Sequence, residues 1–330
     1  MKALVTGASG FIGGAVANTL IQKGVQVRAL LRPGTVANVA QPGAIEAFAG
    51  DLRDAKAVRA AAEGCDAIFH VGGMYSFSAS AAELHAANVD GTLHVVTAAR
   101  EVGARLVHTS SISTVGGMRN GVVPDERQEA TGVAPGPYKE SKWEAELVVK
   151  EAIKRGLDAV IVNPTFPVGA GDIKPTPTGQ VIRDFLEGRI PAYLDTGMNV
   201  VDIDDVAEGH WLAHERGQRG QRYILGNANL MMRELLELLA QISGRKAPRV
   251  RIPYAVALGL AMSGRLIGRN RIPLEGVKTA HEILFASAAK AVRELGMPQT
   301  PVRTALEKAV RWFHQPAVHQ PERSVAHGRA

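Results

Sequence analysis

The sequence contains a single cysteine, Cys65, among its 330 residues. One thiol cannot form an intramolecular disulfide, so the fold needs no oxidising compartment, and we expect the chain to work in a reducing cytoplasm. Cys65 stands between Gly64 and Asp66 at the start of an apolar run, with no activating neighbour visible in the sequence. These surroundings favour a structural thiol over a nucleophile.

Long apolar runs are also missing. The most apolar late stretch, residues 255–262, is followed by Ser263, Gly264 and Arg265. It is far shorter than the roughly 20 residues that cross a bilayer. The first residues read as a strand and a glycine turn rather than as a secretory signal. The sequence therefore predicts no integral membrane segment.

No block of basic residues is present, although 38 Lys and Arg against 32 Asp and Glu give a net charge of +6. Such an excess mildly favours anionic ligands. A cluster such as Arg245, Lys246, Arg249 and Arg251 is more typical of a solvated face than of a phosphate track. We expect a small-molecule substrate as the partner and no nucleic acid.

Short aliphatic runs alternate with helical patterns from the first residues onward. Strands are expected at residues 2–6, 25–31, 45–49, 67–71, 105–109 and 158–162. Helices are expected at residues 13–23, 55–63, 80–102 and 137–155, each followed by a glycine or ending beside one (Gly24, Gly64, Gly103, Gly156). Because crossovers between parallel strands are right-handed, the pattern predicts an α/β fold with a Rossmann-type doubly wound parallel sheet.

The alternation breaks after Asn163 into the proline- and glycine-rich segment PTFPVGAGDIKPTPTG. Short strands are expected at 199–203 and 222–225, and 204–215 resembles another helix that covers the sheet. We therefore expect a dinucleotide-binding domain at 1–165, completed by parts of 198–225, and a smaller, interleaved C-terminal substrate-binding domain, mainly 166–314. Residues 315–330 have almost nothing to bury and are expected to form a disordered tail.

A glycine-rich segment, TGASGFIG at residues 6–13, follows the first expected strand and opens the first helix. In this context Gly7 makes a tight turn, Gly10 lets the backbone approach a pyrophosphate, and Gly13 lets helix and strand pack closely. The helix N-terminus adds N–H groups and positive potential. The segment predicts a dinucleotide site that also includes Ser9, Phe11 and Ile12.

The end of the second expected strand indicates which dinucleotide binds. Sites for NAD usually carry Asp or Glu there, about 20 residues after the turn, to bind the ribose hydroxyls. This chain has no acid there and offers Arg28 and Arg32 in the segment VRALLRPG. A guanidinium can bind a 2′-phosphate. Arg32 is favoured because the strand ends there, before Pro33, so NADP(H) is expected, with NAD(H) as the alternative.

Tyr138 and Lys142 lie four residues apart on an expected helix, and therefore on one face. The strand before this helix, 105–109, ends at Ser110 and Ser111, and open α/β sheets build their sites at the carboxyl ends of strands. A phenol is a poor acid or base near pH 7, and an ammonium group beside it favours the ionised form. We expect Tyr138 to exchange a proton with the substrate oxygen while Ser111 hydrogen-bonds that oxygen.

Together with GDL at residues 50–52, TSS before Ile112, YKESK and NPTFPVG, the glycine turn resembles the extended short-chain dehydrogenase/reductase superfamily over almost the whole chain. The later segments IKPTPTG, PAYLDTG and VDIDDVAEGH more narrowly resemble the hopanoid-associated sugar epimerase family, which is itself close to dihydroflavonol reductases.

The resemblance implies further site residues. Asp51 and Leu52 would border the adenine, although the sequence equally allows Asp51 to cap the helix that follows. The remaining cofactor contacts implied are His70, Val71, Gly72, Thr109, Pro164, Thr165 and Phe166, with Tyr138 and Lys142 also contacting the cofactor. The substrate contacts expected are Tyr75, Ser111, Ser113 and Phe166.

Reduction and epimerisation both need the same Tyr, Lys and Ser. The expected activity is an NAD(P)-dependent oxidoreductase acting on an alcohol or carbonyl of a small hydroxylated or sugar-like substrate, with an NAD-dependent sugar epimerase as the alternative and a non-catalytic dinucleotide sensor as a further one. Dehydratases of this superfamily carry an acidic pair after the serine, where this chain has Ile112 and Ser113.

The same resemblance implies a homodimer through the helix near 84–102 and the helix that bears Tyr138. The apolar residues Leu84, Val95 and Val96 could instead face the sheet. His210 and His214 have the spacing of a helical metal pair, but no third ligand is placed by spacing, so they are interpreted as structural and no metal is expected.

Overall fold

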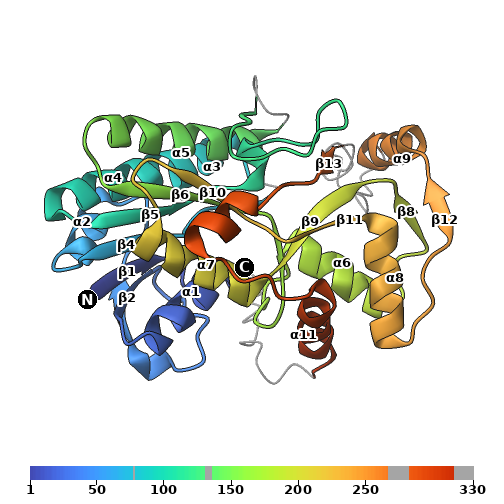
Figure 1. Cartoon of the computed structure of the whole chain (residues 1–330), viewed down its shortest axis with the longest axis horizontal. Coiled ribbons are helices and arrows are strands. Elements are labelled where there is room, and N and C mark those ends of the chain that lie inside the picture. Colours follow the sequence, from blue (N-terminus) through green and yellow to red (C-terminus); the bar gives the residue numbers. More distant parts are fainter. Residues whose placement is uncertain (77–78, 131–135, 267–281, 316–330) are drawn as a thin grey trace, which may run out of the picture.

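A parallel seven-stranded sheet forms the centre of the larger domain (Figure 1). In spatial order its strands are β10 (Arg222–Leu225), β6 (Ala159–Pro164), β5 (Arg105–Thr109), β4 (Ala67–His70), β1 (Lys2–Thr6), β2 (Gln26–Leu31) and β3 (Ile45–Ala49). Neighbouring strands pair in parallel throughout. The order reverses at β1, which is the doubly wound topology that the alternating pattern predicts.

The computed structural model describes residues 1–76, 79–130, 136–266 and 282–315. Most of the tail expected at 315–330 therefore lies outside the described residues. Among the residues described, no helix is both long enough and apolar enough to cross a membrane.

Helices cover both faces of the sheet. On one face α1 (Phe11–Gln22) and α7 (Ile203–Arg216) enclose a core that includes Val5 and Phe69. On the other, α2 (Ala55–Ala62), α4 (Gly91–Val102) and α5 (Pro137–Lys154) enclose a core that includes Ile68 and Leu106. The two layers are visible above and below the sheet in Figure 1. Because successive strand residues point to opposite faces, Ile68 and Phe69 enter different cores. The Rossmann-type fold is confirmed.

The expected helix at 80–102 is one continuous helical segment with a π-helical centre. It consists of α3 (Ala81–His85), η2 (Ala86–Asp90) and α4. Ser80 begins it with a capping box, in which its hydroxyl accepts from the Glu83 amide while the Glu83 carboxylate accepts from the Ser80 amide. Gly103 ends it with φ of 71°, a conformation that favours glycine.

The second domain is smaller and is interleaved with the first. Its main sheet contains β7 (Phe166–Val168), β9 (Gly197–Asp202), β11 (Ala228–Met231) and β13 (Ile283–Leu284), and β8 (Ala192–Leu194) pairs with β12 (Val250–Ile252). Three helices, α6 (Pro177–Leu186), α8 (Met232–Ser243) and α11 (Val302–His314), share one apolar core, while α9 (Tyr254–Leu266) lies beside β8. The short helices are η1 (Pro42–Ala44), η3 (Ile112–Thr114) and η4 (Ala291–Leu295).

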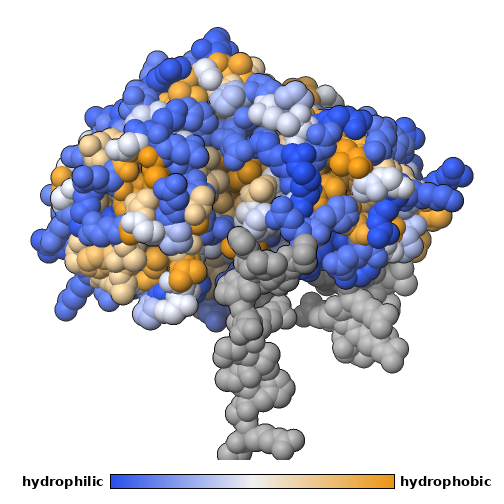
Figure 2. Space-filling view, turned by 90° about the horizontal axis from the view of Figure 1, so that it is seen from below, coloured by the Kyte–Doolittle hydropathy of each residue, from blue (hydrophilic) through white to orange (hydrophobic). Residues whose placement is uncertain are grey.

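Between these elements the chain returns to the large sheet, and η4 later joins the core on the face that α1 and α7 cover. After β9 it forms α7, which packs against α1, and β10, which pairs with β6 at the edge of the sheet. The expected helix at 204–215 thus covers the large sheet, whereas the strand expected at 199–203 belongs to the second sheet. On the face seen in Figure 2, apolar residues are interspersed with polar ones.

Candidate active site

The turn after β1 packs so closely that two of its positions accept only glycine. Gly7 has φ of 77°, and a Cβ there would lie 2.7 Å from the Cα of Gly72. A Cβ on Gly13 would lie 2.1 Å from the Gly7 carbonyl oxygen. The Gly10 amide donates to that same oxygen at 2.9 Å, and Gly10 begins α1 without a side-chain cap. The first amides of α1 are therefore available to an anion, so the turn fits the pyrophosphate of a dinucleotide.

Hydrogen bonds join the carboxyl ends of β1 and β4. The Thr6 hydroxyl accepts from the Gly72 amide at 3.0 Å and bonds to His70 Nδ1 at 2.8 Å. His70 Nε2 lies 3.0 Å from the Thr92 hydroxyl, which donates to the Asn88 carbonyl at 2.5 Å. Since that hydroxyl proton is committed, His70 Nε2–H is the donor to Thr92 and Nδ1 accepts from Thr6. The His70 side chain thus fixes the Thr6 hydroxyl, which in turn holds the Gly72 amide against the glycine turn.

The same network continues to the helix that carries Tyr138. Asn88 Nδ2 donates to the Ser141 hydroxyl at 2.9 Å and to the Met74 carbonyl at 3.1 Å, while Asn88 Oδ1 accepts from the Met74 amide at 2.6 Å. The Ser141 hydroxyl in turn donates to the Tyr138 carbonyl at 2.8 Å. The glycine turn, the loop that leads to Tyr75 and the start of α5 are therefore joined by side chains that no motif had indicated.

Tyr138 lies at the start of α5, next to Tyr75 and Ser111. The Tyr75 and Tyr138 rings meet edge to face, with centroids 4.5 Å apart. Burial raises the pKa of Tyr138 to about 12, against the opposing effect of a hydrogen bond with the Ser111 side chain. The phenol is therefore protonated at neutral pH. It can therefore donate a proton, and its hydrogen-bond partner is Ser111, the serine expected to act beside it.

Lys142 follows one turn later on α5 and is 8% exposed. Its Nζ donates to the Thr109 carbonyl at 2.9 Å, rather than to the phenol, at the end of β5. Burial lowers the pKa of Lys142 to about 8, with Glu146 acting in the opposite direction. His70 and His108 have depressed pKa values because of burial and the Lys142 charge, so these imidazoles are neutral and add no second positive charge beside Lys142.

The turn after Ser111 presents a second hydroxyl. The Ser113 side chain is buried and its Oγ has no hydrogen-bond partner among the described residues. The Ser113 amide donates to Ser111 Oγ at 3.2 Å. Phe166, at the start of β7, packs against Ile112 and Val115 of the same turn. A buried hydroxyl without a partner is the kind of group that a bound ligand completes. The substrate role expected for Ser113 stays a prediction.

The two arginines of the segment VRALLRPG differ in their surroundings. Arg28 is occupied, because its guanidinium donates to Glu46 at 2.8 Å and to the Ala61 and Glu63 carbonyls at 2.8 Å each. Arg32 follows the last residue of the strand and is exposed. The structure therefore leaves Arg32, the arginine favoured from the sequence, accessible to a ligand.

One alternative for Asp51 is wrong. The residue that caps α2 is Asp54, whose carboxylate accepts from the Lys56 and Ala57 amides at 2.9 and 3.2 Å. Asp51 instead forms a two-pronged ion pair with Arg53, with both contacts at 2.9 Å. It is therefore held at the end of β3, next to Leu52.

Several other predicted cofactor residues gather at this edge. A Cβ on Gly72 would lie 2.8 Å from Leu52 Cδ1, and one on Gly7 would lie 2.7 Å from the Gly72 Cα. Gly72 is therefore packed closely between Leu52 and Gly7. Thr109 directs its hydroxyl away, to His210 Nε2 at 2.9 Å. Thr165 bonds to Asn199 Oδ1 at 3.0 Å. Val71 and Pro164 follow and end β4 and β6 respectively. Their contacts with a cofactor remain predictions.

Comparison with known proteins identifies the family. A profile of the NAD dependent epimerase/dehydratase family matches residues 3–226. The chain belongs to this family. A protein of Synechocystis sp. named "Putative dihydroflavonol 4-reductase" is 40% identical to this chain, over 94% of this chain and 93% of its own length. The family match and this relative together confirm that this chain is an NAD(P)-dependent enzyme of the extended short-chain dehydrogenase/reductase type.

Solved structures of the family agree with the fold. The structure of gox2253 has a TM-score of 0.83 and 38% identity, and covers 94% of this chain and 97% of that chain. A nucleoside-diphosphate-sugar epimerase from Pseudomonas aeruginosa has a TM-score of 0.78 and 26% identity, and covers 95% and 97% respectively. The relatives of this epimerase/dehydratase family member thus include both reductases and epimerases.

Two other predictions concern residues outside the reaction. Both nitrogens of His210 are used, Nδ1 by the Val206 carbonyl at 2.8 Å and Nε2 by Thr109, so this residue is structural as expected. Cys65 is buried and burial raises its pKa, as befits a structural thiol.

Sequence reasoning missed Asn88, Ser141 and Glu146. Glu146 had a signal, because it lies four residues after Lys142 and eight after Tyr138, on the same face of α5. Ser141 and Asn88 had none, since their bonds depend on how α5 packs against η2.

Proposed function

We propose that the chain is an NADP(H)-dependent oxidoreductase that transfers a hydride between nicotinamide and an alcohol or carbonyl of a small hydroxylated or sugar-like substrate. The observation that supports it most is the protonated Tyr138 phenol, paired with Ser111 beside a buried Lys142, at the sheet edge that carries the glycine turn. The Synechocystis relative named as a reductase points the same way.

Each side chain has a distinct task. In the reducing direction Tyr138 donates its proton to the carbonyl oxygen, and Ser111 donates a hydrogen bond to that oxygen as negative charge develops. The Lys142 ammonium stabilises the tyrosinate that remains. When bound, the nicotinamide would supply the hydride. In the oxidising direction Tyr138 takes the proton back, and Ser113 and Tyr75 are the further substrate contacts.

Residues at the edge of the sheet would hold the dinucleotide. Gly7, Ser9, Gly10 and Gly13 surround the α1 amides that suit a pyrophosphate. Arg32 is exposed at the end of β2, where a guanidinium suits a 2′-phosphate. This arrangement supports NADP(H) over NAD(H).

A sugar epimerase is the second candidate, supported by the family profile, by the epimerase among the solved structures, and by the sequence resemblance to the hopanoid-associated epimerases. It would use the same Tyr138, Lys142 and Ser111 while keeping NAD⁺ bound. Dehydration is disfavoured on this structure. Burial alone would raise the pKa of the nearby Glu146, but Arg222 and Lys150 lower it to about 2, so this carboxylate has no proton to give a leaving hydroxyl.

Purified protein separates the candidates. The absorption spectrum shows whether a nicotinamide is retained, and NADPH oxidation is followed with a panel of small ketones and sugar-derived carbonyls. The oxidoreductase predicts turnover of NADPH that Tyr138→Phe abolishes. Tightly retained NAD⁺ with no net turnover of added NADPH would refute the oxidoreductase and favour the epimerase.

We also propose a homodimer through α4 and α5. Leu84, Val95 and Val96 are buried within the chain and cannot form such an interface. Leu93 of α4 and Leu147 of α5, by contrast, are 49% and 40% exposed. These side chains give a second copy an apolar contact on the two helices. Light scattering at low protein concentration measures the oligomeric state.

A further inference from the structure

A buried carboxylate lies behind the predicted catalytic residues. Glu146 is on α5, two turns after Tyr138, and is 2% exposed. Its Oε2 accepts from the Ser110 hydroxyl at 2.5 Å, the Thr114 hydroxyl at 2.6 Å and Asn163 Nδ2 at 3.3 Å. Burying a charged carboxylate costs free energy unless hydrogen bonds and cations replace the lost water. Five donors surround Glu146 and offset that cost.

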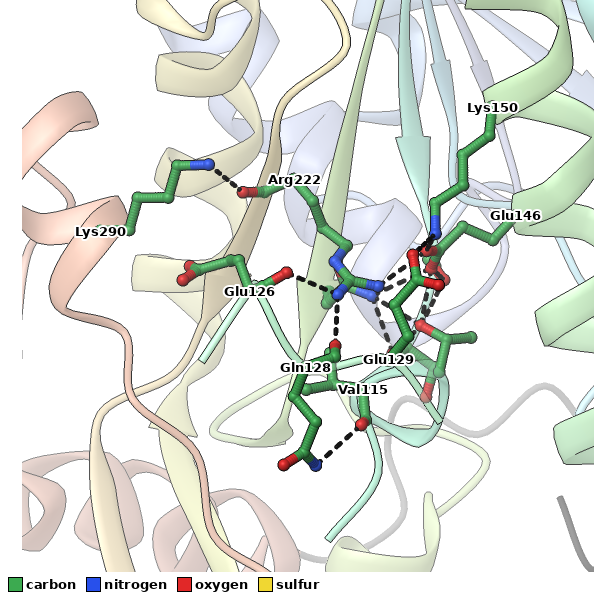
Figure 3. A network of polar contacts seen from close by, with 12 residues as sticks. Val115, Glu126, Gln128, Glu129, Glu146, Lys150, Arg222 and Lys290 are labelled. Carbon is green, nitrogen blue, oxygen red and sulfur yellow. Dashed lines mark hydrogen bonds and ion pairs between the residues drawn. The ribbon is translucent and has the colours of Figure 1, made fainter. Parts of the chain in front are cut away.

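The other donors come from two cations. Arg222 Nη1 on β10 donates to Glu146 Oε1 at 2.9 Å, and Lys150 Nζ lies 3.0 Å from the same oxygen (Figure 3). Lys150 also pairs with Glu129 at 2.6 Å. Arg222 is 7% exposed, so its pair with Glu146 is out of water. Loss of either partner would leave a buried charge uncompensated.

The residues that Glu146 binds bracket the predicted catalytic serine. Ser110 precedes Ser111, and Thr114 ends η3, the short helix that Ser111 caps. The Ser111 carbonyl accepts from Asn163 Nδ2 at 2.9 Å, and Thr114 Oγ1, whose single proton is donated to Glu146, lies 2.9 Å from the same carbonyl. Glu146 therefore ties both ends of the Ser111 turn to the helix that carries Tyr138.

Arg222 extends the same anchor along the chain. Its Nη2 donates to the Glu126 and Gln128 carbonyls at 2.7 and 2.6 Å (Figure 3). The Gln128 side chain donates to the Val115 and Gly117 carbonyls at 3.1 and 3.0 Å. The ion pair between Arg222 and Glu146 is thus connected to residues 126–128 of the segment between η3 and α5 and, through Gln128, to the turn after η3.

We propose that Glu146 is a positioning residue that holds the Ser111 turn against α5, so that Ser111 and Tyr138 face the substrate oxygen together. This inference rests on the proposed function. In the described part of the chain, the charged groups that face Glu146 are Arg222 of β10, Lys142 and Lys150 of α5, and Glu129, which shares Lys150 with it. The titratable groups that face Lys142 are Glu146 and the neutral imidazoles of β4 and β5, so among the described residues Glu146 is the anion that acts on it.

The test compares Glu146→Gln with Glu151→Gln. Glu151 lies on the same helix but is exposed and pairs with Arg155 at 3.0 Å on the surface. We expect kcat for NADPH-dependent reduction to fall roughly 10- to 100-fold in Glu146→Gln, as small misplacements of reacting groups do. The dissociation constant for NADPH should stay unchanged, and the alkaline limb of the pH profile should move to lower pH. Glu146→Asp should recover part of kcat, and Glu151→Gln should match the wild type.

Two further variants separate anchoring from folding. Glu146→Gln/Arg222→Gln removes both buried charges, and it should fold while remaining slow. Thr114→Val removes one anchor and keeps the ion pair, so it should lower kcat without moving the alkaline limb. Wild-type kcat and pH profile in Glu146→Gln, in the double variant or in Thr114→Val would overturn the proposal. Wild-type protein that reduces no carbonyl with either nicotinamide would instead refute the proposed function.

Discussion

Replacing Lys142 by Met is expected to stabilise the protein while abolishing its activity. The Lys142 side chain is buried, and this burial lowers its pKa from 10.5 to about 8. A tenfold change in an ionisation constant corresponds to about 1.4 kcal/mol, so holding this ammonium in the folded state at pH 7 costs about 3 kcal/mol. Lys142→Met also loses the hydrogen bond to the Thr109 carbonyl, which destabilises the variant by about 1 kcal/mol. The expected net gain is about 2 kcal/mol in the free energy of unfolding.

The pH dependence gives the prediction its sign. A group whose pKa is lower in the folded state binds more protons when unfolded, so the wild type gains stability as pH rises from about 8 to 10.5. The advantage of Lys142→Met should therefore be largest at pH 7 and shrink over that interval. Denaturant unfolding of both proteins at a series of pH values measures it.

Lys139 provides a matched control. It lies three residues earlier on α5, is equally buried at 8% exposure, and pairs with Glu282 at 2.8 Å. Lys139→Met should lower stability by about 1 kcal/mol, because the ion pair is lost. A Lys142→Met protein that is less stable than the wild type at pH 7, or whose stability difference does not vary above pH 8, would refute this reasoning.

Three other changes test the cofactor site and the interface. Gly13→Ala places a Cβ 2.1 Å from the Gly7 carbonyl oxygen, so it should destabilise the fold by about 1–3 kcal/mol and abolish nicotinamide binding; calorimetry showing normal binding would contradict the packing argument. Arg32→Ala should weaken NADPH binding roughly tenfold, for about 1.5 kcal/mol, and leave NADH binding unchanged; an equal loss for both would mean that Arg32 does not read the 2′-phosphate. Leu93→Asp combined with Leu147→Asp should give a monomer in light scattering, and a persistent dimer would place the interface elsewhere.

Features with a local cause were predictable from the sequence. The strand at 105–109 and the helix bearing Tyr138 have the expected bounds within a residue or two, because their apolar periods and terminal glycines act over neighbouring residues. The glycine turn was predictable for the same reason. The spacing of Tyr138 and Lys142 also places both on one helix face without any tertiary information.

Contacts between distant segments could not be predicted. The sequence suggested that the Lys142 ammonium lies against the phenol, but it donates to the carbonyl at the end of β5. Asn88 joins Met74 to Ser141 only because η2 packs against α5. The capping role allowed for Asp51 belongs to Asp54, because α2 begins at Ala55, three residues later than a cap at Asp51 would require.

By itself, the sequence determined the parallel sheet, the glycine turn under a helix N-terminus and the pair of reactive side chains on one helix face, because each follows from short-range periodicity and steric limits. The tertiary structure decided which groups surround them: Ser111 beside the phenol, neutral imidazoles near Lys142, and an arginine from a strand 76 residues away that neutralises Glu146. Burial and charge compensation are sums over all segments that pack around a group, so they exist only once the chain has folded.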